Sequence, residues 1–158
     1  MENNDFEDDD IPGVPPEFRA RYVKALGEYS LAFNQMDYVL GELIKSLLKD
    51  MGQESHWKDV CENFGKKLKE IDRLKNTTKG YRISSIDVDK LRGISGERAK
   101  IAHAHMELDY VDKAYKLIWK GDVIGDEETY SAEKVETLAE EIRELGRDLV
   151  GARVFDIR

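Results

Sequence analysis

Cysteine is almost absent from this sequence: Cys61 stands alone among 158 residues. A disulfide within the chain is therefore excluded, and so is a metal site built from several cysteines. A single thiol is typical of proteins from a reducing compartment, so we expect a cytoplasmic protein. Because Cys61 falls among apolar positions, we expect it to be buried as a small hydrophobic side chain.

Long hydrophobic runs and metal-binding clusters are also lacking. No apolar run approaches the roughly 20 residues that span a bilayer. The N-terminus is acidic and lacks the basic start and apolar core of a signal peptide, so no membrane contact is expected. The three histidines form no cluster with metal-ligand spacing, and no glycine-rich phosphate loop is present. The sequence therefore predicts neither a metal nor a cofactor.

Acidic residues outnumber basic ones and give a net charge of -8, but the charge is unevenly distributed. The first ten residues include six acidic and no basic ones, and we expect residues 1–14 to be a disordered tail. Residues 66–82 hold seven basic and two acidic residues, and a local basic surface can bind a polyanion even on an acidic protein. A solvated helix face explains the same pattern, and composition alone favours that alternative. The candidate RNA-binding residues are Lys66, Lys67, Lys69, Arg73 and Lys75.

Along most of the chain, apolar residues recur at steps of three and four, the period of an amphipathic helix. Four helices are predicted: over residues 15–50, over residues 57–74, from Ser84 or Ser85 to about residue 105, and from Ser131 to about residue 149. The serines are suited to the N-cap position of the last two helices. Gly93 and Gly96 are poor helix residues, and we expect them to let another helix approach closely.

Between residues 105 and 120 the period changes from three-to-four to two, because apolar and charged residues alternate on both sides of residues 111–114. This pattern predicts a small β-hairpin, followed by a loop over residues 121–128. The sequence thus predicts an all-α fold: a bundle of four to five helices with a small β-hairpin before the last helix. The helical domain is expected over residues 15–150, with a C-terminal tail over residues 151–158.

Arg98 and His103 are the main candidates for chemistry. A step of five residues turns a helix by about 140°, so the two side chains do not share a face. Arg98 falls within the predicted apolar stripe, where a charged residue is costly unless it meets a partner or an interface. We therefore expect a carboxylate for Arg98, and Asp37 in the first helix is the candidate, either as a structural partner or as part of a site.

His105 lies seven residues after Arg98, close to two full helical turns, so it is expected on the same face as the arginine. One interpretation makes both histidines caps of the helix C-terminus, where cationic groups are favoured, and makes Arg98 a paired arginine at the edge of the core. The other interpretation is a site that binds a phosphodiester and needs no metal.

The segment Arg98-Ala99-Lys100-Ile101-Ala102-His103 resembles the Arg-x4-6-His signature of the HEPN domains. Three further features of this family agree in order: a long first helix with an acidic residue in the segment 33–40, a second helix beginning Phe64-Gly65-Lys66-Lys67, and a short β excursion before a final helix. The resemblance covers about residues 17–150.

The resemblance implies a homodimeric, metal-independent endoribonuclease, a toxin or phage-defence effector. Arg98 and His103 of two copies would then meet in a cleft at the dimer interface, with Asp37 and His105 as accessory residues. Some HEPN proteins pair with a nucleotidyltransferase-like antitoxin, which is a possible partner here.

Two departures from the family pattern support an alternative, a catalytically inactive HEPN-like module that binds a partner protein or nucleotide. Active members usually carry a polar residue directly after the arginine, where this chain has Ala99. Some toxins carry a tyrosine two residues after the histidine, where this chain has His105.

Overall fold

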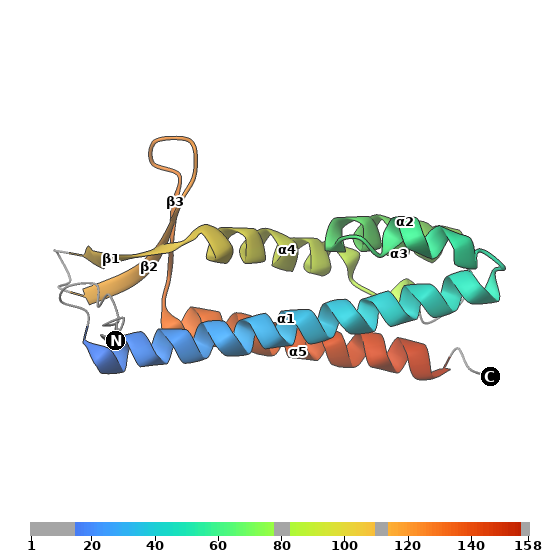
Figure 1. Ribbon diagram of the computed structural model, residues 1–158, viewed down its shortest axis with the longest axis horizontal. Coiled ribbons are helices and arrows are strands. Elements are labelled where there is room, and N and C mark those ends of the chain that lie inside the picture. Colours follow the sequence, from blue (N-terminus) through green and yellow to red (C-terminus); the bar gives the residue numbers. More distant parts are fainter. Residues whose placement is uncertain (1–14, 78–82, 110–113, 156–158) are drawn as a thin grey trace, which may run out of the picture.

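Two long helices that lie side by side form the base of the molecule (Figure 1). The computed structural model describes residues 15–77, 83–109 and 114–155. Helix α1 spans Pro16–Asp50 and α5 spans Ala132–Phe155. The two helices run in the same direction, since Arg21 pairs with Glu133 near their N-terminal ends and Glu28 pairs with Arg143 further along.

Local sequence signals account for most helix boundaries. Pro15 and Pro16 precede and open α1, and the chain leaves the helix at Met51 and Gly52, where glycine has a φ of 69° that other residues rarely adopt. The Ser131 hydroxyl accepts a hydrogen bond of 3.1 Å from the Lys134 amide, which confirms its predicted capping role at α5.

The second predicted helix is broken in the structure. A short 3-10 helix (η1, Glu54–His56) leads into α2 (Trp57–Val60), and α3 begins only at Phe64 and continues to Thr77. Cys61 follows the end of α2 in this break and is exposed, so its predicted burial is wrong. The apolar period continues through the break, but the backbone there turns, and Cys61 faces solvent instead of the core.

Helix α4 spans Val88–His103 and follows a second 3-10 helix (η2, Ile83–Ser85). Its N-cap is Asp87, whose carboxylate accepts a hydrogen bond of 2.9 Å from the Lys90 amide, so the serines predicted for this role do not fill it. A Cβ at Gly93 or Gly96 would meet no atom within 4 Å in the described part of the chain, apart from the backbone of α4 and the adjacent residues. Within one chain, they do not serve the close helix packing that the sequence suggested.

Between α4 and α5 in the sequence, three antiparallel strands form one sheet in the order β1-β2-β3. The strands are β1 (His105–Asp109), β2 (Ala114–Lys120) and β3 (Glu127–Tyr130). The predicted hairpin is confirmed as β1 and β2, with His105 opposite Ile118. The predicted loop over residues 121–128 is partly wrong, because its end belongs to β3, which pairs with β2 and places Tyr130 opposite Leu117.

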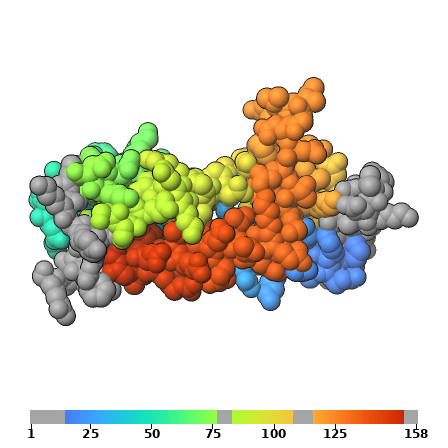
Figure 2. All heavy atoms as spheres, turned by 180° about the vertical axis from the view of Figure 1, so that it is seen from behind, coloured from blue at the N-terminus to red at the C-terminus, as the bar shows by residue number. Residues whose placement is uncertain are grey.

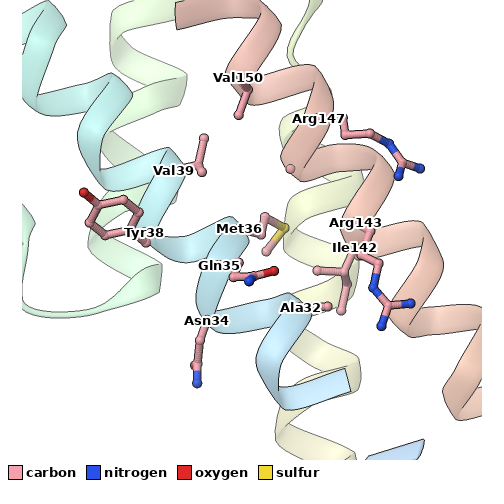
Figure 3. Close-up of a pocket in the computed structure, with 11 residues that line it drawn as sticks. Ala32, Asn34, Gln35, Met36, Tyr38, Val39, Ile142, Arg143, Arg147 and Val150 are labelled. Atoms are coloured by element: carbon pink, nitrogen blue, oxygen red, sulfur yellow. The ribbon is translucent and has the colours of Figure 1, made fainter. Parts of the chain in front are cut away.

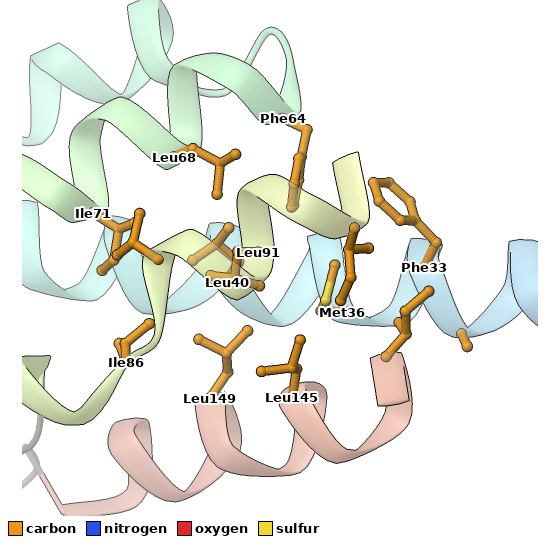
Figure 4. Packing of buried hydrophobic residues seen from close by; sticks show 14 of the residues in the cluster. Phe33, Met36, Leu40, Phe64, Leu68, Ile71, Ile86, Leu91, Leu145 and Leu149 are labelled. Carbon is orange, nitrogen blue, oxygen red and sulfur yellow. The ribbon is translucent and has the colours of Figure 1, made fainter. Parts of the chain in front are cut away.

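The hydrophobic core lies between the α1–α5 pair and the layer formed by α3 and α4 (Figure 4). Phe33 of α1 contacts Phe64 of α3 with a distance of 5.0 Å between ring centroids. Fully or almost fully buried residues from these elements include Met36, Leu40, Ile71, Leu91, Ile142 and Leu149. The fold is therefore mostly helical, with five α-helices in the described part of the chain and the small sheet before the last one.

Helix α5 continues to Phe155, so the predicted start of a C-terminal tail at residue 151 is too early. The predicted tail over residues 1–14 lies outside the described residues. In the described part of the chain, no helix combines the length and the apolar character that a membrane crossing requires.

Candidate functional site

The C-terminal half of α4 carries both residues of the Arg-x4-His pattern. The helix ends at His103, because Ala104 adopts an extended backbone with φ -74° and ψ 151° and leads directly into β1. Arg98 and His103 are both exposed and point in different directions from the helix, as their spacing predicts. A single chain therefore does not bring the two side chains together.

Arg98 lies against an aromatic surface instead of a carboxylate. Its Cζ atom is 4.5 Å from the centroid of the Phe33 ring, within the range of a cation–π contact. Phe33 is buried and packs on Phe64, so the guanidinium rests on a fixed platform at the edge of the core. The prediction that Arg98 lies within the buried apolar stripe is wrong, because its side chain extends along the face of Phe33 at the edge of the core and is exposed to solvent.

Arg98 also differs from most other arginines of the described chain, because it forms no ion pair there. Five other arginines in the described part of the chain each form an ion pair with an aspartate or glutamate, namely Arg21, Arg73, Arg92, Arg143 and Arg147. Arg98 has no such partner among the described residues. Its guanidinium keeps all of its hydrogen-bond donors available for an anion.

Asp37 does not pair with Arg98, which corrects the sequence-based expectation. Its Oδ1 accepts a hydrogen bond of 2.7 Å from Nζ of Lys67. Lys67 is 8% exposed, so its ammonium needs a counter-charge where it lies. Asp37 sits on α1 one turn beyond Phe33 and faces α3, which places its carboxylate next to the lysine instead of the arginine.

The two histidines belong to different elements. His103 is the last residue of α4 and is exposed. His105 begins β1, and its Nε2 lies 3.4 Å from Oε2 of Glu107. The expectation that His105 shares a helix face with Arg98 is therefore wrong, because the helix has ended before His105.

Two buried tyrosines, Tyr130 and Tyr29, lie near Glu97, and no sequence pattern indicated their role, since both fall at ordinary core spacing. Tyr130 of β3 donates a hydrogen bond of 2.8 Å to Oε2 of Glu97, and this contact ties β3 to α4 one residue before Arg98. Burial and the adjacent Glu97 carboxylate raise the pKa of Tyr130 far above its ordinary value. Tyr22 donates a hydrogen bond of 2.8 Å to the carbonyl oxygen of Tyr130.

The second tyrosine, Tyr29, is 3% exposed, and its hydroxyl has no hydrogen-bond partner among the described residues. Burial, reinforced by the Glu97 carboxylate, raises the pKa of Tyr29 to about 12, while Arg98 acts in the opposite direction. Tyr29 precedes Phe33 by one helical turn, so both aromatic residues lie on the side of α1 that faces α4.

Lys100 and Lys134 hold Glu128 from two sides. Lys100 of α4 donates a hydrogen bond of 2.7 Å to Oε2, and Lys134 of α5 donates one of 2.5 Å to Oε1. The hydrogen bonds from the two ammonium groups lower the pKa of Glu128 to about 2. This three-residue network joins α4, β3 and α5, and it fixes the end of α4 that carries Arg98 and His103.

Most of the basic residues predicted for RNA binding are occupied by other contacts. Lys66 pairs with Glu62, Lys67 with Asp37, and Arg73 with Glu70, while Lys75 donates to the carbonyl oxygen of Ile86. Lys69 is exposed and has no ion-pair partner among the described residues. Three of these five cations are therefore paired with carboxylates, while Lys69 and Lys75 have no carboxylate partner among the described residues.

A search of the described residues finds no group of histidine, cysteine and carboxylate side chains that could hold a metal ion. Comparisons of the chain with protein-family models, curated proteins and solved structures find no match.

Proposed function

We propose that the chain is a metal-independent endoribonuclease of the HEPN type, with an HEPN-like bundle fold, that cleaves RNA in a cleft between two copies. The observation that carries this proposal is the exposed guanidinium of Arg98, which rests on Phe33 and has no carboxylate partner among the described residues. An arginine fixed in this way is suited to bind a phosphate, because its planar donors match the phosphate oxygens.

The second copy is needed for geometric reasons. Arg98 and His103 point about 140° apart on α4, so one copy cannot place both against one phosphate. Two α4 helices that cross near Gly93 and Gly96 would bring the two His103 side chains to one groove, because His103 lies seven residues after Gly96, close to two full helical turns. The open space around these glycines leaves room for such an approach.

In the proposed reaction the 2'-hydroxyl of the RNA attacks the adjacent phosphorus. His103 of one copy removes the hydroxyl proton, and His103 of the other copy gives a proton to the departing 5'-oxygen. Arg98 stabilises the additional negative charge of the pentavalent phosphorus. The products are a 2',3'-cyclic phosphate and a free 5'-hydroxyl, and no metal takes part.

The test is cleavage of labelled RNA by the purified protein with EDTA present. Cleavage with 2',3'-cyclic phosphate ends is expected for the wild type and is lost in His103→Ala. His105→Ala is the matched control, because this exposed histidine lies two residues away and is expected to retain activity. If the wild type cuts no better than His103→Ala, the nuclease proposal is overturned.

Ala99 favours a second candidate, a binding module without catalysis. Its side chain is exposed directly beside Arg98 and supplies no hydrogen-bonding group. In this case the protein binds RNA, a nucleotide or a partner such as a nucleotidyltransferase-like antitoxin without cleavage. Binding of intact RNA that Arg98→Ala abolishes, in the absence of any cleavage product, would select this candidate.

A further inference from the structure

An apolar groove runs between α1 and α5 on the base of the molecule (Figure 3). Its volume is about 680 Å³, within the range of sites that bind other molecules. Most of the side chains that line it are apolar, Asn34 and Gln35 of α1 are polar, and the arginines of α5 stand at its rim. The apolar residues include Ala32, Met36, Val39, Ile142 and Val150.

Part of the groove surface is exposed. Gly146 contributes no side chain to it, and a Cβ at this position would lie 3.9 Å from Met36, an ordinary van der Waals contact. Val150 is 44% exposed and Tyr38 is 66% exposed, so apolar surface continues from the groove to solvent. Unpaired apolar surface of this kind marks a site of interaction.

A complementary feature protrudes on the side of the molecule opposite the α1–α5 base (Figure 1). The segment Gly121–Asp126, here called the hairpin arm, joins β2 to β3 and stands clear of the helices (Figures 1 and 2). Its tip carries Val123, 71% exposed, and Ile124, fully exposed. Two hydrogen bonds hold the turn, from the Gly121 amide to the Asp126 carbonyl at 2.6 Å and from the Asp126 amide to the Val123 carbonyl at 3.0 Å. The two aliphatic side chains are therefore presented on an ordered turn.

We propose that the hairpin arm of one copy docks into the α1–α5 groove of a second copy. The exposed Val123 and Ile124 would be covered by the apolar walls of the groove, which no described residue of the same chain fills. The charges also match. Asp122, Asp126 and Glu127 flank the tip and are exposed, whereas the groove is bordered by Arg143 and Arg147.

Both rim arginines pair with carboxylates of their own chain, Arg143 with Glu28 and Glu140, and Arg147 with Glu140. Arg147 uses one nitrogen for Glu140 at 3.0 Å, and its side chain is 64% exposed. A guanidinium has five N–H donors, so its remaining donors are available to the acidic residues of the arm. A membrane is a poorer occupant for the arm, because its acidic residues would be repelled by anionic lipid.

The arm cannot fill the groove of its own chain. It joins the body where β3 leads into α5 at Ala132, whereas the groove is centred near Gly146. These positions are about 20 Å apart along the helix. The arm also points away from the α1–α5 pair (Figure 1). The contact is therefore between copies, and it involves neither Arg98 nor His103, so it does not depend on the proposed nuclease activity.

Disulfide trapping between two differently tagged proteins tests this contact directly. Both carry Cys61→Ser, which removes the exposed native thiol. One carries Ile124→Cys at the tip of the arm, and the other carries Val150→Cys in the groove. After mixing and mild oxidation, a disulfide between the two tagged chains is expected at a yield at least fivefold above that of the control pair.

The control pair combines Ile124→Cys with Val23→Cys, since Val23 is 62% exposed on α1 but does not line the groove. Arg147→Glu in the groove protein is expected to lower the yield at least threefold, because it places a carboxylate opposite the acidic arm. Equal yields for the two pairs overturn the proposal. A second experiment deletes residues 1–14 and measures how fast a thiol reagent labels Val150→Cys. If the deletion makes labelling faster, the acidic N-terminal segment covers the groove, and the proposal is overturned.

Discussion

Lys67 on α3 donates a hydrogen bond of 2.7 Å to Asp37 in the middle of α1. This contact satisfies an ammonium group that is almost completely buried, and it also removes the carboxylate that the sequence offered to Arg98. Arg98 instead rests on Phe33 and has no carboxylate partner among the described residues. The Lys67–Asp37 pair thus joins α3 to α1, and Asp37 is not the partner of the candidate phosphate-binding arginine.

Replacement of Asp37 is expected to destabilise the protein. Asp37→Ala leaves the buried ammonium of Lys67 without a counter-charge, and the free energy of unfolding should fall by about 1–3 kcal/mol. Urea denaturation measures this change. The matched control is Glu62→Ala, which breaks the exposed pair with Lys66 and should cost under about 1 kcal/mol. Equal effects of the two variants would contradict the role assigned to Asp37.

Arg98→Ala is expected to lower the rate of RNA cleavage strongly while changing the stability of the protein little. The side chain is exposed and has no ion pair among the described residues, so unfolding should change by under about 1 kcal/mol. The rate of RNA cleavage should fall by about 10²–10³, the usual effect of removing a group that stabilises transition-state charge. Arg92→Ala is the control on the same helix, because Arg92 pairs with Asp72 and Asp89. A similar loss of cleavage in Arg92→Ala would argue against a specific role of Arg98.

The two buried tyrosines beneath α4 should respond in opposite ways to loss of the hydroxyl. Tyr29→Phe removes a buried group that has no partner among the described residues, so stability should be unchanged or rise by up to about 1 kcal/mol. Tyr130→Phe removes the donor to Glu97 and should cost about 1–3 kcal/mol. Thermal unfolding of the two variants and the wild type measures these changes in stability. A destabilised Tyr29→Phe would show that this hydroxyl has a stabilising contact.

Gly96→Ala is expected to stabilise a single chain. Beyond the backbone of α4 and the adjacent residues, a Cβ at this position meets no described atom within 4 Å, and alanine is favoured over glycine in a helix by about 0.5–1 kcal/mol. Gly96→Leu should in addition raise the dissociation constant of the proposed α4 dimer at least tenfold, because its side chain blocks close helix approach. Analytical ultracentrifugation measures this dissociation constant. Both proteins also carry Ile124→Asp, which is expected to prevent docking of the hairpin arm, so that only the α4 contact is measured. Gly27→Ala, on the exposed side of α1, is the control that should leave dimerisation unchanged.

The contribution of Glu128 to stability should depend on pH. Its pKa in the folded protein is about 2, below the ordinary value of 4.5, so the stabilisation is complete above about pH 4.5 and is lost as the pH falls towards 2. The difference between these pKa values is worth at most about 3 kcal/mol. At pH 7 Glu128→Gln should therefore be less stable than the wild type, and the difference should shrink between pH 4.5 and 2. A difference that stays constant over this range would contradict the lowered pKa.

The local patterns of the sequence predicted most of the secondary structure. The spacing of apolar residues gave α1, α4 and α5, and the change to alternation gave β1 and β2. The third strand was missed because Glu127–Tyr130 is short and mostly polar, and it becomes a strand by pairing with β2. The break after Val60 was missed because apolar residues on both sides keep a helical period.

The candidate site was only partly predictable. The exposure of His103 at the end of a helix follows from local signals. The partner of Asp37 was predicted wrongly, because Lys67 reaches it from a helix 30 positions away in the sequence. Glu97 and Tyr130 were not identified, since their contact spans 33 positions and neither residue type is unusual at its place.

The sequence by itself determined α1, α4 and α5, the first hairpin and the spacing of Arg98 and His103, because these depend on the helical period and on capping residues close along the chain. Tertiary structure decided which carboxylate neutralises which cation. It also decided that Arg98 rests on Phe33 and that the groove between α1 and α5 stays open. These outcomes depend on how α3, α4 and α5 pack against α1, and the desolvation of a charge is set by that packing and not by its neighbours in sequence.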